Sequence, residues 1–239
     1  HSYGLIQPVI SFTELFKIID TGNRQNSDRD PFIEMLSGPS YYPALTKGGN
    51  YFGLSSSLMF SLLLGAQSVH SGNMVVLDDT KSEILSRQFA RLDWGDAFRY
   101  FGHPENNADI LKPFEYAGFF NMKAYTKGYV NNYKKINGLF PAMAEKAREF
   151  KKQIEAIGIP FNKIVANVLK QLPADLLDMD TKKALAKYMC ISAFETASFG
   201  PEGTFEEFAE KMSEILENRL KQVTELTDPE PSKHSDFMH

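Results

Sequence analysis

Cysteine is nearly absent from this 239-residue sequence, which has a single one, Cys190. One cysteine excludes an intramolecular disulfide, and its place in the apolar stretch KALAKYMCISAF predicts a small buried hydrophobic side chain. The sequence also lacks a large excess of charge of one sign, since its formal net charge is -4 at pH 7. Such a balance produces no long-range field that would attract nucleic acid or an anionic bilayer, so neither partner is favoured.

A hydrophobic run long enough to cross a membrane is also missing. The densest apolar stretch covers residues 54–66 and contains four serines, whereas a spanning helix needs roughly 20 mostly apolar residues. We therefore expect no transmembrane segment. On a helix that begins near Ser55, leucines and Met59 would form one wide stripe, and Phe60 and Leu64 would lie on the other side. A helix that is apolar nearly all round is either central in the core or covered by a second protein.

Several catalytic sequence patterns are absent as well. The chain has no His-Glu-x-x-His sequence, no cysteine pair and no repeated Glu-x-x-His motif, which argues against zinc and di-iron centres. It has no Gly-x-Ser-x-Gly elbow, no P-loop and no Gly-x-Gly-x-x-Gly after a strand. Large classes of hydrolases, kinases and dehydrogenases therefore lose support, and the sequence identifies no cofactor.

The charge that is present is unevenly distributed. Residues 1–80 contain eleven Asp, Glu, Lys or Arg residues, and the remaining 159 contain forty-five. The charge-poor third includes SGPSYYPALTKGGNYFG, a stretch without sustained periodicity that predicts a long loop. Loops of that length in compact domains are usually functional or held by a partner. The serines Ser55, Ser56 and Ser57 that follow it are expected to cap the apolar helix and form its first turn.

Periodicity and capping residues predict a mainly α protein. We expect a helical, bundle-like body from about residue 80 to 226, and an irregular N-terminal third, 1–79, with short helices and at most one or two short strands. Together these would form a single compact domain, 1–226, followed by a flexible tail, 227–239. The predicted elements are helices over 11–22 and 30–38, a strand at 74–79, a helix after Thr80 with Phe89 on its apolar face, and helices over 141–158, from Pro160, over 178–200, and from Thr204.

The first residue is His1 and not Met. This start is expected either where a targeting segment has been removed or where an artificial boundary was introduced, so the localisation stays open. An N-terminal histidine can chelate copper through its amino nitrogen and its imidazole, with His70 or His103 as the second ligand. Copper-dependent polysaccharide monooxygenases have a similar arrangement, but they are β-sandwiches and this chain is helical. The alternative is that His1 is an incidental terminal residue.

The segments HSYG, KGGNYFGLSSS and MVVLDDTKSEIL resemble, in their order, elements of ADP-ribosyltransferases of the diphtheria-toxin type. In that family a His and a Tyr flank the nicotinamide of NAD, a Ser-rich turn follows the Tyr, and a Glu on a later strand completes the site. The resemblance implies His1, Tyr51 and Ser57 as candidate catalytic residues. Glu115 is the nearest match to the glutamate, although its surroundings do not predict a strand.

Two functions of different classes follow. In the first, the chain is a non-catalytic helical accessory or subunit protein whose charge-poor third packs on a protein partner or on a second copy. The contact residues would then be Tyr41, Tyr42, Tyr51, Phe52, Phe60 and Leu64. In the second, it is an enzyme or ligand-binding protein that uses a nucleotide or another small ligand, in a cleft between that third and the helical body. The NAD-using transferase is one form of this alternative.

Overall fold

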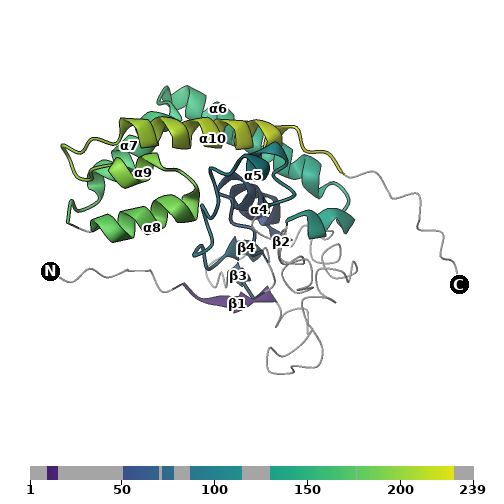
Figure 1. The fold of residues 1–239 in the computed structure, drawn as a ribbon. Coiled ribbons are helices and arrows are strands. Elements are labelled where there is room, and N and C mark those ends of the chain that lie inside the picture. Colours follow the sequence, from purple (N-terminus) through teal and green to yellow (C-terminus); the bar gives the residue numbers. More distant parts are fainter. Residues whose placement is uncertain are drawn as a thin grey trace, which may run out of the picture.

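The computed structural model describes residues 10–15, 51–69, 72–77, 87–114, 130–175 and 177–228. These residues form a mainly helical fold with a small sheet, which confirms the predicted fold class (Figure 1). Labels follow Figure 1, and the elements run in the order β1 Phe12–Glu14, β2 Tyr51–Phe52, α4 Leu54–Leu63, β3 Met74–Leu77, β4 Arg87–Arg91, α5 Pro104–Ala108, the 3-10 helix η3 Val130–Lys135, α6 Leu139–Ile157, α7 Phe161–Gln171, α8 Met179–Met189, α9 Ala193–Thr196 and α10 Glu206–Thr224.

The sheet has the strand order β1-β3-β4-β2. Strand β3 pairs antiparallel with both β1 and β4, and the two-residue β2 runs parallel to the start of β4. In the pairing of β3 with β4, Met74 lies opposite Arg91 and Val76 lies opposite Phe89. This register brings the beginning of β3 and the end of β4 together, which matters for the site described below.

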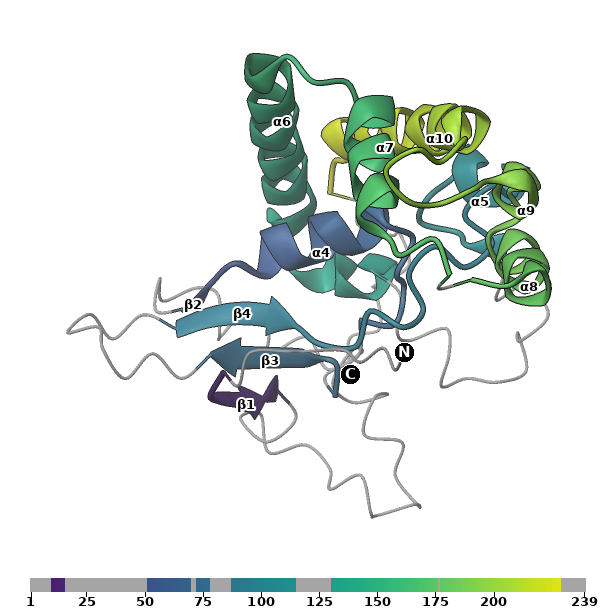
Figure 2. The ribbon, with the colours of Figure 1, turned by 90° about the vertical axis from the view of Figure 1, so that its left-hand side faces the viewer.

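Helix α4 lies between the sheet and the helical body (Figure 2). It contacts β4 on one side and α6 and α10 on the other, and Leu58 and Leu62 are fully buried. Phe60 and Leu64, on the far side of the helix, also pack against the core. The predicted helix is therefore confirmed. Two surroundings were expected for it, the core of the protein or a second protein, and the core covers most of it. Its N-cap is Gly53 in a left-handed conformation and not a serine, which corrects the predicted capping role.

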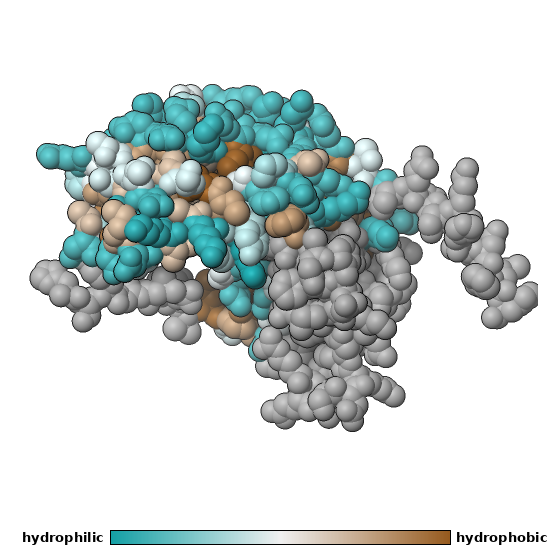
Figure 3. Space-filling view, viewed as in Figure 1, coloured by the Kyte–Doolittle hydropathy of each residue, from teal (hydrophilic) through white to brown (hydrophobic). Residues whose placement is uncertain are grey.

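The helical body follows the sequence closely. Helix α6 ends at Gly158, whose left-handed backbone lets its N–H bond to the carbonyls of Ile154 and Glu155. Pro160 precedes α7, and α10 packs against both α6 and α7. Hydrophilic residues cover the upper part of the molecule, where α6 and α10 lie (Figure 3). The predicted amphipathic helices of this part are confirmed.

Two predicted helices and the expected number of strands are wrong. Residues 12–14 form a strand and not part of a helix over 11–22, because their backbone bonds to β3. Phe89 lies on β4 and not on a helix, and its burial alternates with that of exposed Gln88. Residues 1–79 contribute three strands, β1, β2 and β3, whereas at most two were expected. Aromatic and β-branched residues of this part pair across the sheet.

The predicted helix over 178–200 is divided at Cys190. Cys190 has a left-handed backbone, with φ at 55°, and ends α8 before the short helix α9. A residue that ends a helix in this way points away from its apolar stripe, and Cys190 is exposed, not buried as expected.

Parts of the prediction fall outside the described residues. These are the helix over 30–38, residues 37–50 of the loop predicted over 37–53, and most of the tail, of which only Thr227 and Asp228 are described. No helix among the described residues is long and apolar enough to cross a membrane.

Candidate functional site

The first feature of interest is an open groove of about 860 Å³ between α4, β4 and the side of α6. Phe52 and Trp94 flank it with 51% and 39% of their surface exposed. The other lining residues are Gly53, Ser55, Ser56, Ser57, Phe60, Leu64, Gln88, Phe89, Ala90, Arg91 and Lys146. Four of the predicted residues, Ser57, Phe52, Phe60 and Leu64, are thus brought to one surface.

An aromatic side chain in the wall of this groove packs against α6. Phe60 makes an edge-on contact with Phe150 of α6, with ring centroids 5.2 Å apart. At the rim, Lys146 binds Glu149 at 2.8 Å, and this hydrogen bond raises the pKa of the lysine. The groove therefore combines an apolar wall, serine hydroxyls and two cations, Arg91 and Lys146, each paired with a carboxylate, which suits contact with a protein surface.

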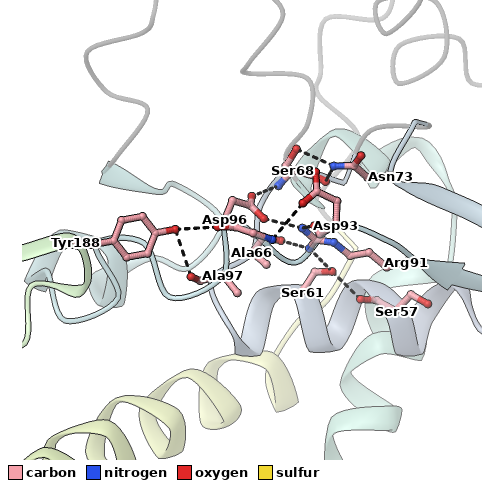
Figure 4. Close-up of polar contacts among 11 residues, drawn as sticks. Ser57, Ser61, Ala66, Ser68, Asn73, Arg91, Asp93, Asp96, Ala97 and Tyr188 are labelled. Atoms are coloured by element: carbon pink, nitrogen blue, oxygen red, sulfur yellow. Dashed lines mark hydrogen bonds and ion pairs between the residues drawn. The ribbon is translucent and has the colours of Figure 1, made fainter. Parts of the chain in front are cut away.

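The second feature lies at the open end of the β3–β4 hairpin, where the end of β4 is next to the start of β3. It is on the opposite side of Arg91 from the groove. The N–H of Leu92 bonds to the carbonyl of Asn73 at 2.8 Å. Asp93, the next residue, therefore emerges beside Asn73 although the two are twenty positions apart in sequence. Figure 4 shows the Asp93 carboxylate directed toward Ser68 and Asn73.

The side chain of Asn73 is oriented by hydrogen bonds. Its amide nitrogen donates to the carbonyl of Ser68 at 3.1 Å and to the Ser68 hydroxyl at 3.2 Å. A carbonyl oxygen only accepts, so this contact fixes which end of the amide carries the nitrogen. Asn73 is only 7% exposed, and no donor among the described residues is paired with its amide oxygen.

Asp93 has an unusual backbone. Its φ is 54°, in the left-handed region, and one carboxylate oxygen accepts from the N–H of Gly95 at 3.2 Å. Phe98 and Tyr100 also have positive φ values. Left-handed conformations cost free energy for residues other than glycine and are concentrated at functional sites.

An ion pair supports this turn. Arg91, whose side chain is fully buried, binds Asp96 at 2.9 Å. Burial lowers the pKa of the guanidinium, and the Asp96 carboxylate opposes that shift. Arg91 also donates to the hydroxyl of Ser61 at 2.8 Å and to the carbonyl of Ala66. The second oxygen of Asp96 accepts from the N–H of Ser68 at 2.9 Å. The ion pair therefore joins β4, α4 and the loop that precedes Asn73 (Figure 4).

The same turn rests on the end of α8. The hydroxyl of Tyr188 donates to the carbonyls of Gly95 and Ala97 at 3.2 and 3.4 Å. Further along, the N–H of Gly102 bonds to the carbonyl of Met189 at 2.7 Å. A Cβ atom on Gly102 would lie 2.4 Å from the carbonyl oxygen of Cys190, so only glycine permits this approach.

Together these contacts form a small polar pocket of about 270 Å³. Its walls are Ser68, Asp93, Gly95, Asp96, Arg99 and Tyr188. It differs from the apolar groove in that two carboxylates face one space. Among the described residues, no group of three or more His, Cys, Asp or Glu side chains could hold a metal by itself. A cation here would need oxygen ligands supplied by a substrate.

The chemistry of this pair of residues fits magnesium. Mg²⁺ prefers carboxylate, amide carbonyl and phosphate oxygens, and it is usually held by one or two carboxylates together with substrate phosphates. Asp93 offers a carboxylate from the wall of the pocket, and Asn73, whose backbone pairs with Leu92, offers an amide oxygen from outside that wall. No lysine occurs among the described residues of the N-terminal third to meet the phosphates.

Sequence reasoning missed both residues. The chain lacks the glycine-rich phosphate loops by which kinases can be identified in a sequence. The available signal was Asp93-Trp94-Gly95 directly after a strand, preceded by an asparagine at the start of the strand before it.

The remaining predicted residues are not brought together in the described part of the chain. His1, Tyr41, Tyr42, His70 and Glu115 lie outside the described residues. His103 caps α5 by accepting from the N–H of Glu105, and its ring stacks on Phe114 with centroids 3.8 Å apart. Tyr51 lies on β2, next to α4. The copper chelate and the NAD site therefore stay predictions.

A family model for the LepB N-terminal domain matches residues 3–228 of the chain. The chain belongs to this family. The solved structure of an N-terminal 618-residue fragment of LepB from Legionella pneumophila is similar to it, with 39% sequence identity and a TM-score of 0.61. The match covers 93% of this chain and 34% of the fragment, so the chain spans about a third of that structure. No curated protein matches.

Membership of the LepB N-terminal domain family extends over nearly the whole chain. It includes both the apolar groove and the polar pocket, since each lies within residues 3–228. The family description gives a position within a larger protein and no activity. Neither a catalytic nor an accessory role follows from it.

Proposed function

We propose that this chain binds a nucleoside triphosphate with its magnesium at the end of the β3–β4 hairpin and transfers a phosphoryl group from it. This is a form of the second function expected from the sequence, a nucleotide-using enzyme with a cleft between the N-terminal third and the helical body. The residues differ from those expected, because Asn73 and Asp93 replace Tyr51 and the histidines.

The observation that carries the proposal is the backbone pairing of Asn73 with Leu92, the residue that comes directly before Asp93-Trp94-Gly95. In protein kinases, the Asn of the catalytic loop and the Asp of an Asp-Phe-Gly sequence hold the two magnesium ions that bridge the phosphates. Here an Asn at the start of one strand and an Asp-x-Gly at the end of its partner lie side by side. Tryptophan takes the place of phenylalanine.

This chain departs from the kinase pattern at the residue that accepts the proton of the attacking hydroxyl. In the kinase pattern His-Arg-Asp-x-x-x-x-Asn, the Asp that accepts the proton of the attacking hydroxyl lies five residues before the Asn. That position is Ser68 in this chain. The proposal therefore assigns metal and phosphate binding to Asn73 and Asp93, and it needs another carboxylate for the proton.

The test is the binding of Mg-ATP, measured by isothermal titration calorimetry on the wild-type chain and on Asp93→Asn. Asn cannot supply a negative charge to the cation, so we expect the affinity for Mg-ATP to fall about 10-fold or more. ATP with EDTA should bind the two proteins equally weakly.

Asp180→Asn is the matched control, because Asp180 is exposed in the first turn of α8. It should bind Mg-ATP like the wild type. Failure of the wild-type chain to bind Mg-ATP, or equal affinities for wild type and Asp93→Asn, would contradict the proposal.

A second candidate function is the protein contact expected from the sequence. It is favoured by the groove that gathers Phe52, Phe60, Leu64 and Trp94 on one surface. Exposed aromatic residues are enriched at protein interfaces, where they contribute much of the binding energy. Phe52 and Trp94 would be the anchors, and the hydroxyls of the α4 serines would meet polar groups of the partner.

Self-association is the form of this contact that can be tested without a known partner. Sedimentation velocity would compare the wild-type chain with Phe52→Ser, and with Val168→Ser as an equally exposed control on α7. Dimerisation that weakens only in Phe52→Ser would support a self-contact through the groove. A chain that stays monomeric at high concentration would contradict it.

A further inference from the structure

Resting on the proposed phosphoryl transfer, we infer that Asp96 takes the proton of the attacking hydroxyl or water, the role that the kinase pattern gives to the position of Ser68. The pocket at the hairpin end then contains two carboxylates with different tasks. Asp93 binds the cation, and Asp96 accepts the proton of the attacking hydroxyl or water.

The position of Asp96 supports this assignment. Its Oδ2 atom accepts from the backbone N–H of Ser68 at 2.9 Å, so a carboxylate lies next to the residue that takes the position of the base in the pattern. Ser68 and Asp96 line the same pocket as Asp93. The Asp96 side chain is 19% exposed, so it can be reached from that pocket.

The contacts of Asp96 hold its side chain in place. Its Oδ1 atom binds the buried guanidinium of Arg91 at 2.9 Å. A carboxylate oxygen can accept more than one hydrogen bond, so each oxygen keeps capacity for an incoming hydroxyl. A carboxylate held in this way has little freedom to turn away from the reacting group.

The oxygen of water or of an acceptor hydroxyl forms a bond to the γ-phosphorus of the nucleotide, and the bond from that phosphorus to the bridging oxygen breaks. Nucleoside diphosphate leaves with the electron pair of the broken bond. The proton of the attacking hydroxyl passes to the Asp96 carboxylate and is later released to solvent.

The test uses Mg-ATP labelled on the γ-phosphate, with release of inorganic phosphate and labelling of the chain itself as readouts. In Asp96→Asn the amide oxygen can keep one of the two hydrogen bonds, and the side chain can no longer take a proton. We expect transfer to fall about 10²- to 10⁴-fold while the affinity for Mg-ATP stays within about threefold of wild type.

A rescue variant separates this role from a structural one. Ser68→Asp combined with Asp96→Asn returns a carboxylate to the position that the kinase pattern uses. Transfer should recover by about tenfold or more, within the range that general base catalysis contributes. A structural defect would not be repaired in this way. If Asp96→Asn does not fold, Arg91→Met with Asp96→Asn removes both charges of the buried pair and takes its place in both comparisons.

The outcomes distinguish the two proposals. Binding of Mg-ATP by the wild type with transfer lost in Asp96→Asn and regained in the rescue variant supports both. Unchanged transfer in Asp96→Asn, or loss of transfer without rescue, overturns the role of Asp96 and leaves nucleotide binding in place. A wild type that binds Mg-ATP but never turns it over overturns both the role of Asp96 and the proposed transfer, and leaves only nucleotide binding in place. A wild type that does not bind Mg-ATP overturns the proposed function itself.

Discussion

The helical body and the hairpin region are stabilised in different ways. Helices α6, α7 and α10 bury apolar stripes, and their polar residues lie mainly at the surface. In the stretch from α4 to α5, which contains the β3–β4 hairpin, the buried polar side chains are Ser61, Gln67, Asn73, Arg91 and Asn106. Of the two buried polar residues on α10, Arg219 reaches into that same region. Burying polar groups costs free energy unless they are paired, so their concentration marks the part of the fold where positions are most closely specified.

The largest effect should follow from removing the link between the two regions. Arg219 is 2% exposed and donates to the carbonyls of Leu62 and Asn106, and to the side chain of Asn107. Arg219→Ala leaves buried acceptors without donors, so we expect a loss of about 4 kcal/mol in the free energy of unfolding. Urea denaturation measures it.

A matched control for this change exists on α6. Arg148 also donates from its guanidinium to a backbone carbonyl, that of Thr224, but at an exposed position. Arg148→Ala should cost less than about 1 kcal/mol. Similar losses for the two arginines would show that burial does not set the strength of these contacts, and the comparison of regions would fail.

A smaller loss is expected from the apolar core of the helical body. Met143 on α6 is fully buried, whereas Met179 at the start of α8 is 51% exposed. Met143→Ala should destabilise the fold by about 3 kcal/mol through lost burial and the cavity left behind. Met179→Ala should change stability by less than about 0.5 kcal/mol. Because the first effect is apolar, 0.5 M salt should leave it unchanged; a strong salt dependence would argue against this account.

The smallest effect on stability is expected at Asp178, the exposed residue that caps the N-terminus of α8. Asp178 accepts from the N–H of Thr181 at 2.7 Å, and this hydrogen bond lowers the pKa of the carboxyl below its ordinary value of 3.8. The stabilisation is present above pH 4 and is lost as the pH falls through the lowered pKa of the folded state. Thermal unfolding should therefore separate wild type from Asp178→Ala at pH 7 and not at pH 2. A difference that persists at pH 2 would contradict this origin.

The sequence predicts these two regions unequally well. The boundaries of α6, α7 and α10 follow from periodic apolar residues and from Gly158, Pro160 and Thr204, because each signal is local. The strand β4 could not be predicted in this way, since Phe89 is as compatible with an amphipathic helix as with a strand until its pairing with β3 is known. Short apolar runs carry too little local information to decide between the two.

The candidate site was harder to predict for the same reason. Asn73 and Asp93 come together only through the register of two strands, and neither residue stands out alone. The aromatic residues Phe52 and Phe60 could be singled out because their segment has few charges. Their common surface became visible only when α4 was placed over β4.

The exposed thiol at the end of α8 offers a practical handle on the polar pocket. Cys190 is the sole cysteine of the chain and lies two residues after Tyr188, whose hydroxyl supports the turn at Gly95. A fluorophore attached there would label one position without prior mutagenesis. Partial burial raises the pKa of this thiol, so coupling should proceed faster in alkaline buffer. The dye would then report, in real time, whether the turn beside it rearranges when nucleotide is added.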